Sequence, residues 1–253
     1  MGLWETPRAR HSDEVRAAIT RAAEEATRRR HREVGTTHLL WSLLACPSVE
    51  GCLSAICVEP SAARATLSAE LDALPRSGWM TFRRPRRSFD ALLTVALKLA
   101  AGTPQRLLTA PLLVARLFGE GGGERCASLA KVGFVRTDYL RVVAHGAVAA
   151  APPPSDGLVT VVLVDDPFTT MAHVVETLRE VFGITSDAER IMLRVHRTGR
   201  GVVGTMDAAT AREKIAAVHA RAAAAGMPLR AVAALDAAPD AAASAPVGVS
   251  SVE

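Results

Sequence analysis

The chain has few aromatic residues and no long hydrophobic run. Aromatic residues make up 4% of its 253 positions while 49% are hydrophobic, so aliphatic side chains and alanine must form the cores. No run approaches the roughly 20 uninterrupted apolar residues of a membrane-spanning helix. The first 16 residues also lack an apolar signal core. We therefore expect a cytoplasmic chain with no membrane partner.

The sequence also lacks the motifs of common catalytic classes. It holds no Gly-x4-Gly-Lys-Ser/Thr motif for nucleotide phosphates and no Gly-x-Ser-x-Gly motif for a nucleophilic serine. The glycine-rich segment 119–123 has no following lysine and no preceding strand, so we interpret it as a loop. These absences predict a non-catalytic protein with no cofactor.

Cysteine is scarce, and its spacing is typical of neither disulfides nor zinc. The four cysteines, Cys46, Cys52, Cys57 and Cys126, form no Cys-x-x-Cys pair. A zinc site with His38 would need a ligand spacing that does not occur here. The prediction is buried thiols in a reducing compartment and no metal site.

A net charge of +4 raises the question of nucleic-acid binding. The excess is local, in Arg28–Arg30 and in 83–87. The first cluster follows Glu24 and Glu25 on a predicted helix, which indicates a solvated face, and the second lies in a connector. Neither cluster has interleaved aromatic residues, so we predict no nucleic-acid partner.

Residues 10–74 show helical periodicity with several start signals. Ser12 or Asp13 is placed to cap a first helix, Thr36 or Thr37 a second, and Ser61 a fourth. A short third helix carries Cys52, Leu53 and Ile56. Short amphipathic helices of this kind are stable only when they bury one another's apolar faces.

The same pattern returns after about 73 to 76 residues, in a second copy over about 86–146. There Ser88 begins a predicted helix and 109–117 repeats the pattern of 36–44. The segment 35–40, Gly-Thr-Thr-His-Leu-Leu, resembles the signature of the Clp N-terminal domain, the double four-helix repeat of Clp-type unfoldases. The resemblance implies an all-α duplicated four-helix repeat over 1–146. We interpret His38 as structural, because it stands at a helix start within a repeat.

A linker and a second domain follow. Residues 147–157 contain three consecutive prolines, which favour a stiff polyproline II connector. Residues 158–235 show the order β-α-α-β-α-β, with strands over Leu158–Val164, Gly201–Met206 and Leu229–Leu235. Gly183 is placed to end the first helix of this part, and Asp187 and Asp207 are placed to begin the next two. This order predicts a small α+β sandwich, with a three-stranded antiparallel sheet and three helices, and the tail 236–253 is predicted to be disordered.

Two carboxylates at the end of the first strand and a histidine near a helix end suggest a binding pocket. Asp165 and Asp166 follow the strand, and His196 lies in the last turn of the second helix. Apolar candidates between them are Met171, Val174, Met192 and Val195. Such a pocket is acidic at its mouth and apolar inside.

These motifs resemble ClpS, the adaptor that delivers N-degron substrates to Clp proteases. The resemblance covers 158–235 and includes Val-Leu-Val-Asp-Asp, Met-Leu-x-Val-His, Gly199-x-Gly201 and Gly226-x-Pro228-Leu229. It implies that Asp165, Asp166 and His196 hold the amino group and that Met171 selects by size. It implies a pocket lining of Thr169, Val174, Met192, Val195 and Leu229. Asp165 stands where the family usually has Asn, and Pro167 where many members have Asp.

The resemblance also implies partners. These are N-degron peptides or proteins and the N-domain of a Clp-type AAA+ unfoldase, with Lys214 on the docking face and Ala209 in place of a family Glu. Because this chain carries both kinds of domain, we also expect contact between its two domains. Two alternatives remain: a Clp-associated regulatory protein whose pocket no longer reads N-termini and which competes for docking on the unfoldase, and a metal-dependent enzyme using Asp165, Asp166 and His196.

Overall fold

The computed structural model describes residues 10–76, 84–85, 107–118 and 123–234. The chain forms two compact units, with the main division between Ala149 and Ala150. The helix predicted to begin at Ser88 and the predicted disordered tail 236–253 lie outside the described residues. No helix of the described part is long and apolar enough to cross a bilayer.

The first unit is helical, and its first helix shows why. Helix α1 (Asp13–Arg28) begins at Ser12, whose hydroxyl accepts a hydrogen bond from the Val15 amide, as predicted. The buried face of α1 repeats every three to four residues, through Val15, Ala18, Ala22 and Ala26. The other helices described in this unit are α2 (Thr36–Leu43), α3 (Pro47–Ala55), α4 (Pro60–Asp72), α6 (Ala110–Leu117), α7 (Gly123–Ala130) and α8 (Arg136–His145).

The internal repeat is confirmed at the level of the backbone. Helices α4 and α8 begin 76 residues apart, and so do α3 and α7. The turn before α4 places Cys57 at φ 58°, and the turn before α8 places Gly133 at φ 85°. In each turn the following amide reaches back five residues, from Val58 to the Leu53 carbonyl and from Phe134 to the Leu129 carbonyl. The same turn therefore occurs in both copies.

Short strands join the two copies. Strand β1 (Arg10–His11) pairs in parallel with β4 (Leu107–Leu108), and β2 (Glu33–Val34) pairs in parallel with β3 (Arg84–Pro85). Strands β1 and β3 lie 74 residues apart, as do β2 and β4. The first strand of each copy thus pairs with the second strand of the other. The repeats interlock, which periodicity alone does not predict.

Two predicted helix starts are wrong. Helix α2 begins after Gly35, whose amide donates to Nδ1 of His38 at 3.1 Å, so neither Thr36 nor Thr37 is the N-cap. Helix α4 begins after Glu59, with a proline at the first helical position, and Ser61 lies inside the helix. Proline suits that position because it has no amide hydrogen to leave unpaired and its φ is already helical.

The solvated face predicted for the first arginine cluster is also wrong for its central residue. The side chain of Arg29 is 8% exposed and lies against Glu25, which is 6% exposed. Arg29 also donates to the hydroxyl of Ser68 on α4 at 2.7 Å. Hydrogen bonds from Arg28 and Arg29 hold the pKa of Glu25 at about 2, although burial acts in the opposite direction. Arg29 thus pairs with Glu25 of α1 and also joins the end of α1 to Ser68 of α4.

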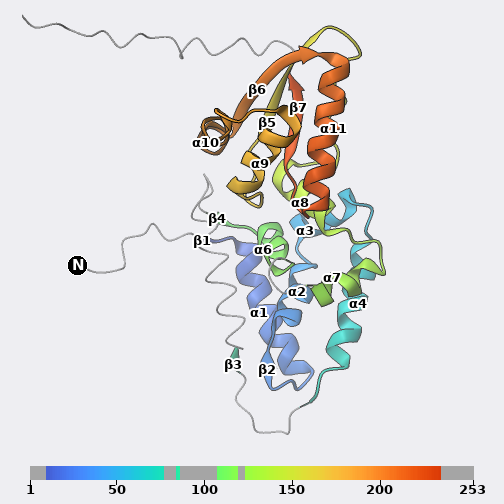
Figure 1. Cartoon of the computed structure of the whole chain (residues 1–253). Helices are drawn as coiled ribbons and strands as arrows, with labels where there is room; N and C mark the ends of the chain where they lie inside the picture. The colour runs from blue at the N-terminus through green and yellow to red at the C-terminus, as the bar shows by residue number, and fades with distance from the viewer. Residues whose placement is uncertain (1–9, 77–83, 86–106, 119–122, 235–253) are drawn as a thin grey trace, which may run out of the picture. The chain divides into compact units, whose positions relative to one another are not determined.

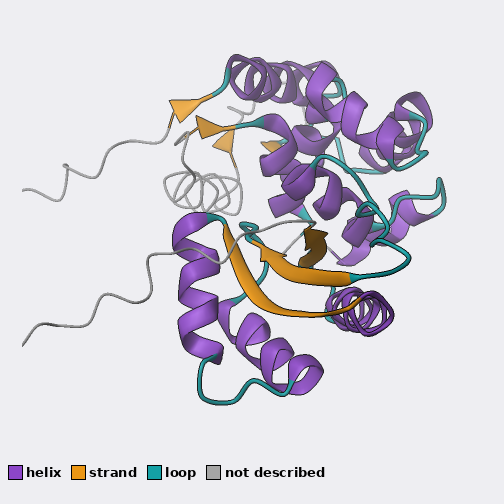
Figure 2. Ribbon diagram, turned by 90° about the horizontal axis from the view of Figure 1, so that it is seen from above, coloured by secondary structure: helices purple, strands orange, loops and turns teal. Residues whose placement is uncertain are grey.

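The second unit is the predicted α+β sandwich. Its antiparallel sheet has the order β6-β5-β7, from β5 (Leu158–Val164), β6 (Arg200–Asp207) and β7 (Arg230–Ala234). Three helices cover one face (Figure 1, Figure 2): α9 (Met171–Phe182), α10 (Ala188–Thr198) and α11 (Ala208–Ala224). Helix α9 lies between α10 and α11 (Figure 1). Alternate residues of β5, Val159, Val161 and Leu163, pack against these helices.

One glycine lets α10 approach the sheet closely. A Cβ atom on Gly201 of β6 would lie 2.5 Å from Cγ2 of Val195 and 3.3 Å from the carbonyl oxygen of Ile191. Real Cβ atoms do not approach other heavy atoms so closely. The absence of a side chain at Gly201 therefore sets the position of α10, and α10 carries His196 of the predicted site.

Candidate functional site

Asp165 and His196 face each other at the edge of the second unit. The Asp165 amide donates to the Gly199 carbonyl at 2.9 Å, which ties the residue after β5 to the residue after α10. The Oδ1 atom of Asp165 lies 3.8 Å from Nδ1 of His196, with the two side chains 35% and 57% exposed. Burial raises the pKa of the Asp165 carboxyl, and the charge of Asp166 adds to this, while His196 opposes it.

Asp166 has a different environment. Its side chain is buried, and Oδ1 accepts hydrogen bonds from the amides of Phe168 at 2.8 Å and Thr169 at 2.7 Å. Its Oδ2 accepts from the Thr169 hydroxyl at 2.7 Å. Both oxygens are thus engaged within the turn that leads into α9. The structure shows Asp166 holding this turn in shape, which is the Asx arrangement that an Asp-Pro turn favours.

The predicted apolar lining divides into a buried group and one exposed residue. Val174, Met192, Val195 and Leu229 are each at most 9% exposed and belong to one core cluster. Met171, the first residue of α9, is 45% exposed. Met171 is therefore the one predicted apolar site residue whose side chain is open to solvent. The other four belong to the buried core of the second unit.

Lys214, predicted to lie on a docking face, has an internal partner. Its Nζ donates to the Val181 carbonyl at 2.7 Å and lies 5.5 Å from the ring centre of Phe182. A cation is favourable there, because the last carbonyls of a helix carry partial negative charge. Lys214 thus fastens α11 to the C-terminal end of α9. Its role in partner docking stays a prediction.

Two buried polar residues of α9 were missed by sequence reasoning. His173 is 7% exposed and Thr177 is fully buried, and neither His173 Nε2 nor Thr177 Oγ1 has a hydrogen-bond partner within the described part of the chain. Burial and the charge of Arg221 lower the pKa of His173. The available signal was their spacing of four residues, which puts both on the same flank of the helix.

Metal ligation finds no support at the site. Within the described ranges, no three His, Cys, Asp or Glu side chains converge in a way that could hold a metal ion. Asp165 and His196 provide two ligands, and both oxygens of Asp166 are engaged by Phe168 and Thr169.

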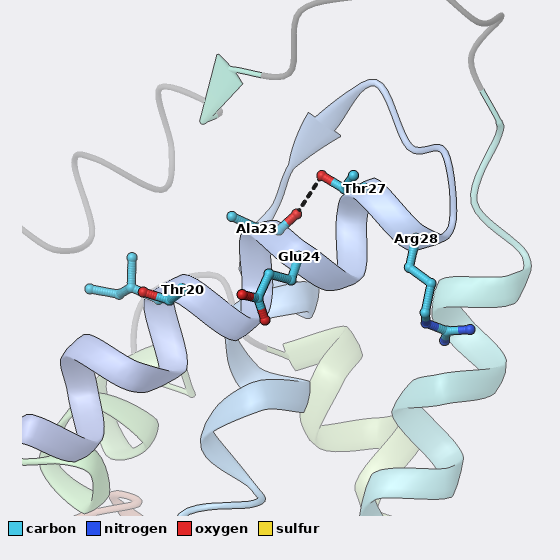
Figure 3. A pocket seen from close by; sticks show the side chains of 6 residues that line it. Thr20, Ala23, Glu24, Thr27 and Arg28 are labelled. Atoms are coloured by element: carbon cyan, nitrogen blue, oxygen red, sulfur yellow. Dashed lines mark hydrogen bonds between the residues drawn. The ribbon is translucent and has the colours of Figure 1, made fainter.

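A surface pocket of about 630 Å³ lies elsewhere, along α1 of the first unit. Figure 3 shows Thr20, Ala23, Glu24, Thr27 and Arg28 along this face, with the Thr27 hydroxyl donating to the Ala23 carbonyl. Ile19 completes the described lining, and none of these residues belongs to the predicted site.

Comparison with known families agrees with this division of the chain. Residues 10–128 match the Clp repeat (R) N-terminal domain, and residues 155–232 match the ATP-dependent Clp protease adaptor protein ClpS. The fold and site thus define a Clp repeat domain followed by a ClpS domain. Through its second unit, the chain belongs to the ClpS family.

Individual relatives show how far the similarity extends. The ATP-dependent Clp protease adapter protein ClpS of Acetivibrio thermocellus is 53% identical over 73 residues, which cover 28% of this chain and 74% of that protein. Its counterpart in Nitratidesulfovibrio vulgaris is 52% identical over 71 residues, 28% of this chain and 71% of that protein. The Hsp104 N-terminal domain from Candida albicans aligns with 50% of this chain and 84% of its own, at a TM-score of 0.44 and 14% identity.

Proposed function

We propose that this chain is an adaptor of an ATP-dependent Clp protease. It binds proteins through a free α-amino group and a bulky apolar first residue, and hands them to a Clp-type unfoldase. The relatives of the second unit carry the name of Clp protease adapters, which supports the adaptor role. The substrate class is supported by the chemistry of the site.

The observation that carries this proposal is the exposed pair Asp165 and His196, with the exposed Met171 at the start of the helix that follows Asp165. A protonated α-amino group offers up to three N–H donors, and a carboxylate and an imidazole nitrogen 3.8 Å apart can both accept from it. Met171 is 45% exposed, so its side chain could offer apolar contact to a bulky first side chain. Asp166 and Thr169 keep the turn beside Asp165 in shape.

Rough energetics give the expected affinity. Charge-assisted hydrogen bonds contribute roughly 1.5–3 kcal/mol each. Burying a Leu- or Phe-sized side chain contributes roughly 1.5–3 kcal/mol. Two or three such bonds and one buried side chain together offset the free-energy cost of lost translational and rotational freedom. The net binding free energy corresponds to a Kd of about 1 μM and is too small for picomolar binding.

The test is a titration with labelled peptides that differ only at their N-terminus. We expect a peptide beginning with Phe to bind with a Kd of about 1 μM, and its N-acetylated form to lose at least about 100-fold, because the ammonium is gone. His196→Ala should also weaken binding. Asp156→Asn, at the opposite end of β5, is the matched surface control and should leave binding unchanged. Equal affinity for the free and acetylated peptides would refute the proposal.

A second candidate is a Clp-associated regulator that competes for docking on the unfoldase without reading N-termini. The full engagement of Asp166 within its own turn favours it, because this leaves one carboxylate at the mouth of the site. It predicts no discrimination between free and acetylated peptides, together with binding of the chain to an isolated unfoldase N-domain.

A further inference from the structure

We propose that the site, taken as the amine-binding site above, recognises the α-amino group and the first side chain without using the first peptide carbonyl. Its ligand class then extends to apolar primary amines that carry no carbonyl group. The proposal rests on the proposed function and deepens it. It follows from which groups at the site can donate a hydrogen bond.

The residue nearest the incoming amino group cannot donate. Asp165 is the half-exposed carboxylate facing His196, and an ionised carboxylate only accepts hydrogen bonds. The carbonyl of a first residue lies one carbon beyond the amino group. An ammonium held by Asp165 therefore brings that carbonyl oxygen close to a negatively charged, acceptor-only group, where it gains no bond.

Three hydrogen-bond donors of the neighbouring turn, from Phe168 and Thr169, point inward towards Asp166. The amides of Phe168 and Thr169 both donate to Oδ1 of Asp166, and the Thr169 hydroxyl donates to its Oδ2. The amide of Asp165 itself donates to the Gly199 carbonyl. None of these groups is available to a ligand carbonyl while the turn keeps its shape.

His196 is the remaining polar side chain among the nine predicted site residues, all of which the structure describes. Its Nδ1 lies 3.8 Å from Oδ1 of Asp165, where it would accept a hydrogen bond from the ammonium. When Nδ1 accepts, the proton of the neutral ring lies on Nε2, at the other edge of the imidazole. With side-chain exposures of 35% and 57% for Asp165 and His196, the carbonyl can keep its hydrogen bonds to water.

The experiment uses the full chain and three fluorescein-labelled peptides beginning with Phe-Ala. One has an ordinary first peptide bond. The second replaces that bond with a trans carbon–carbon double bond, which keeps the ammonium and the side chain but removes the carbonyl. The third has a thioamide, which retains the N–H but accepts hydrogen bonds weakly. We expect the three Kd values, measured by fluorescence polarisation, to agree within about threefold.

Asp165→Asn supplies the missing donor at the same place. This variant should prefer the ordinary peptide over the alkene peptide by roughly 2- to 10-fold, the value of one neutral hydrogen bond. Asp156→Asn, which changes the charge equally, should behave as the unaltered chain. Comparing peptide ratios between variants cancels differences in amine protonation. The unaltered chain decides the proposal by itself if Asp165→Asn does not fold.

The outcomes separate the two proposals. Similar binding of all three peptides supports the inference. Binding of the ordinary peptide with a loss of tenfold or more for both modified peptides overturns the inference and leaves the proposed function standing. If none of the three binds while the chain is folded, the proposed function is overturned, and this inference with it.

Discussion

At the scale of single residues, the adjacent carboxylates Asp165 and Asp166 differ in exposure and in partners. Asp165 is half-exposed and faces His196, while Asp166 is buried and holds its own turn. The difference arises because successive residues after a strand point in different directions, so one carboxylate meets solvent and the next meets backbone amides. Met171, at the start of α9, is 45% exposed, and its role in selecting ligands by size stays a prediction.

Met171→Ala should broaden the selection. Removing an exposed side chain at the rim frees room for β-branched first residues, so Ile and Val peptides should gain about 3- to 10-fold relative to Leu, in line with 1 to 2 methylene groups of apolar contact. The measurement is a fluorescence polarisation titration with peptides that differ in their first residue. Leu193→Ala is the control, because Leu193 is similarly exposed but is not among the site residues. An unchanged preference among Leu, Ile and Val would show that Met171 does not select.

A buried histidine pair makes the first unit sensitive to acid. The Nδ1 atom of His31 lies 2.8 Å from Nε2 of His38, and His38 is 1% exposed. Burial above all, with the charge of His31 as a further cause, lowers the pKa of His38 to about 4. The pKa of His38 is about 4 in the folded chain and about 6.5 in the unfolded chain, so the unfolded chain binds more protons at pH values between these two. The contribution of neutral His38 to the free energy of unfolding is therefore fully present above about pH 6.5 and is lost as the pH falls towards about 4.

We expect the first unit to lose about 2 kcal/mol of unfolding free energy between pH 7.5 and pH 5. Urea unfolding, followed by tryptophan fluorescence, to which Trp41 on α2 contributes, measures this change. Glu25 does not account for it, because the pKa of Glu25 is about 2 and its contribution changes only in stronger acid. His38→Gln should be less stable at pH 7.5 but should show a flatter pH dependence. An equally steep dependence in that variant would contradict the assignment to His38.

At the scale of elements, the contact between α10 and β6 positions the site. Gly201 allows Val195 to reach the strand, and His196 follows Val195 on the same helix. A second contact holds α9 in place: Lys214 of α11 donates to the Val181 carbonyl at the C-terminal end of α9. The packing of α10 against β6 therefore positions His196, while Asp165, Asp166 and Thr169 lie in the turn between β5 and α9.

Gly201→Ala should destabilise the second unit and weaken peptide binding together. The added methyl group would lie 2.5 Å from Val195, and the overpacking should cost about 1–3 kcal/mol. Gly204→Ala is the matched control on the same strand, because a Cβ there meets nothing within 4 Å. Thermal unfolding and peptide titration of both variants test this. Equal stability of the two variants would mean that α10 moves away at no cost.

At the scale of the whole molecule, two families are joined in one chain. The expected docking of the ClpS part on the Clp repeat part stays a prediction. The predicted linker 147–157 has about eleven residues, and such a tether raises the effective concentration of one part around the other towards millimolar. Even a weak attraction would then keep the two parts together for much of the time.

NMR spectra test this docking. We expect the amide resonances around Lys214 to differ between residues 155–253 alone and the whole chain, because docking would change their surroundings. The amides of β5, buried in the sheet, serve as the reference for an intact fold. Superimposable spectra at every position would show two parts that move independently.

Much of the architecture followed from the sequence alone, because the relevant signals are local. The strand Leu158–Val164, the caps Ser12 and Asp207, and the helix end at Gly183 were predicted correctly. Hydrophobic periodicity and capping chemistry act within a few residues, so they can be recognised without knowing the fold. The offset of about 73 to 76 residues identified the duplicated helical unit for the same reason.

Only the tertiary structure decided which polar groups are engaged inside the protein. It placed Arg29 in a buried pair with Glu25, and it directed the Asp166 carboxylate towards the backbone amides of its own turn. It also paired the short strands across the two copies. It also joined Lys214 to the end of α9. A charged side chain can reach many partners along the sequence, and the favourable one depends on distance and burial in three dimensions. The exposure of Asp165 and His196, and the engagement of Asp166 within the turn, are therefore properties of the fold.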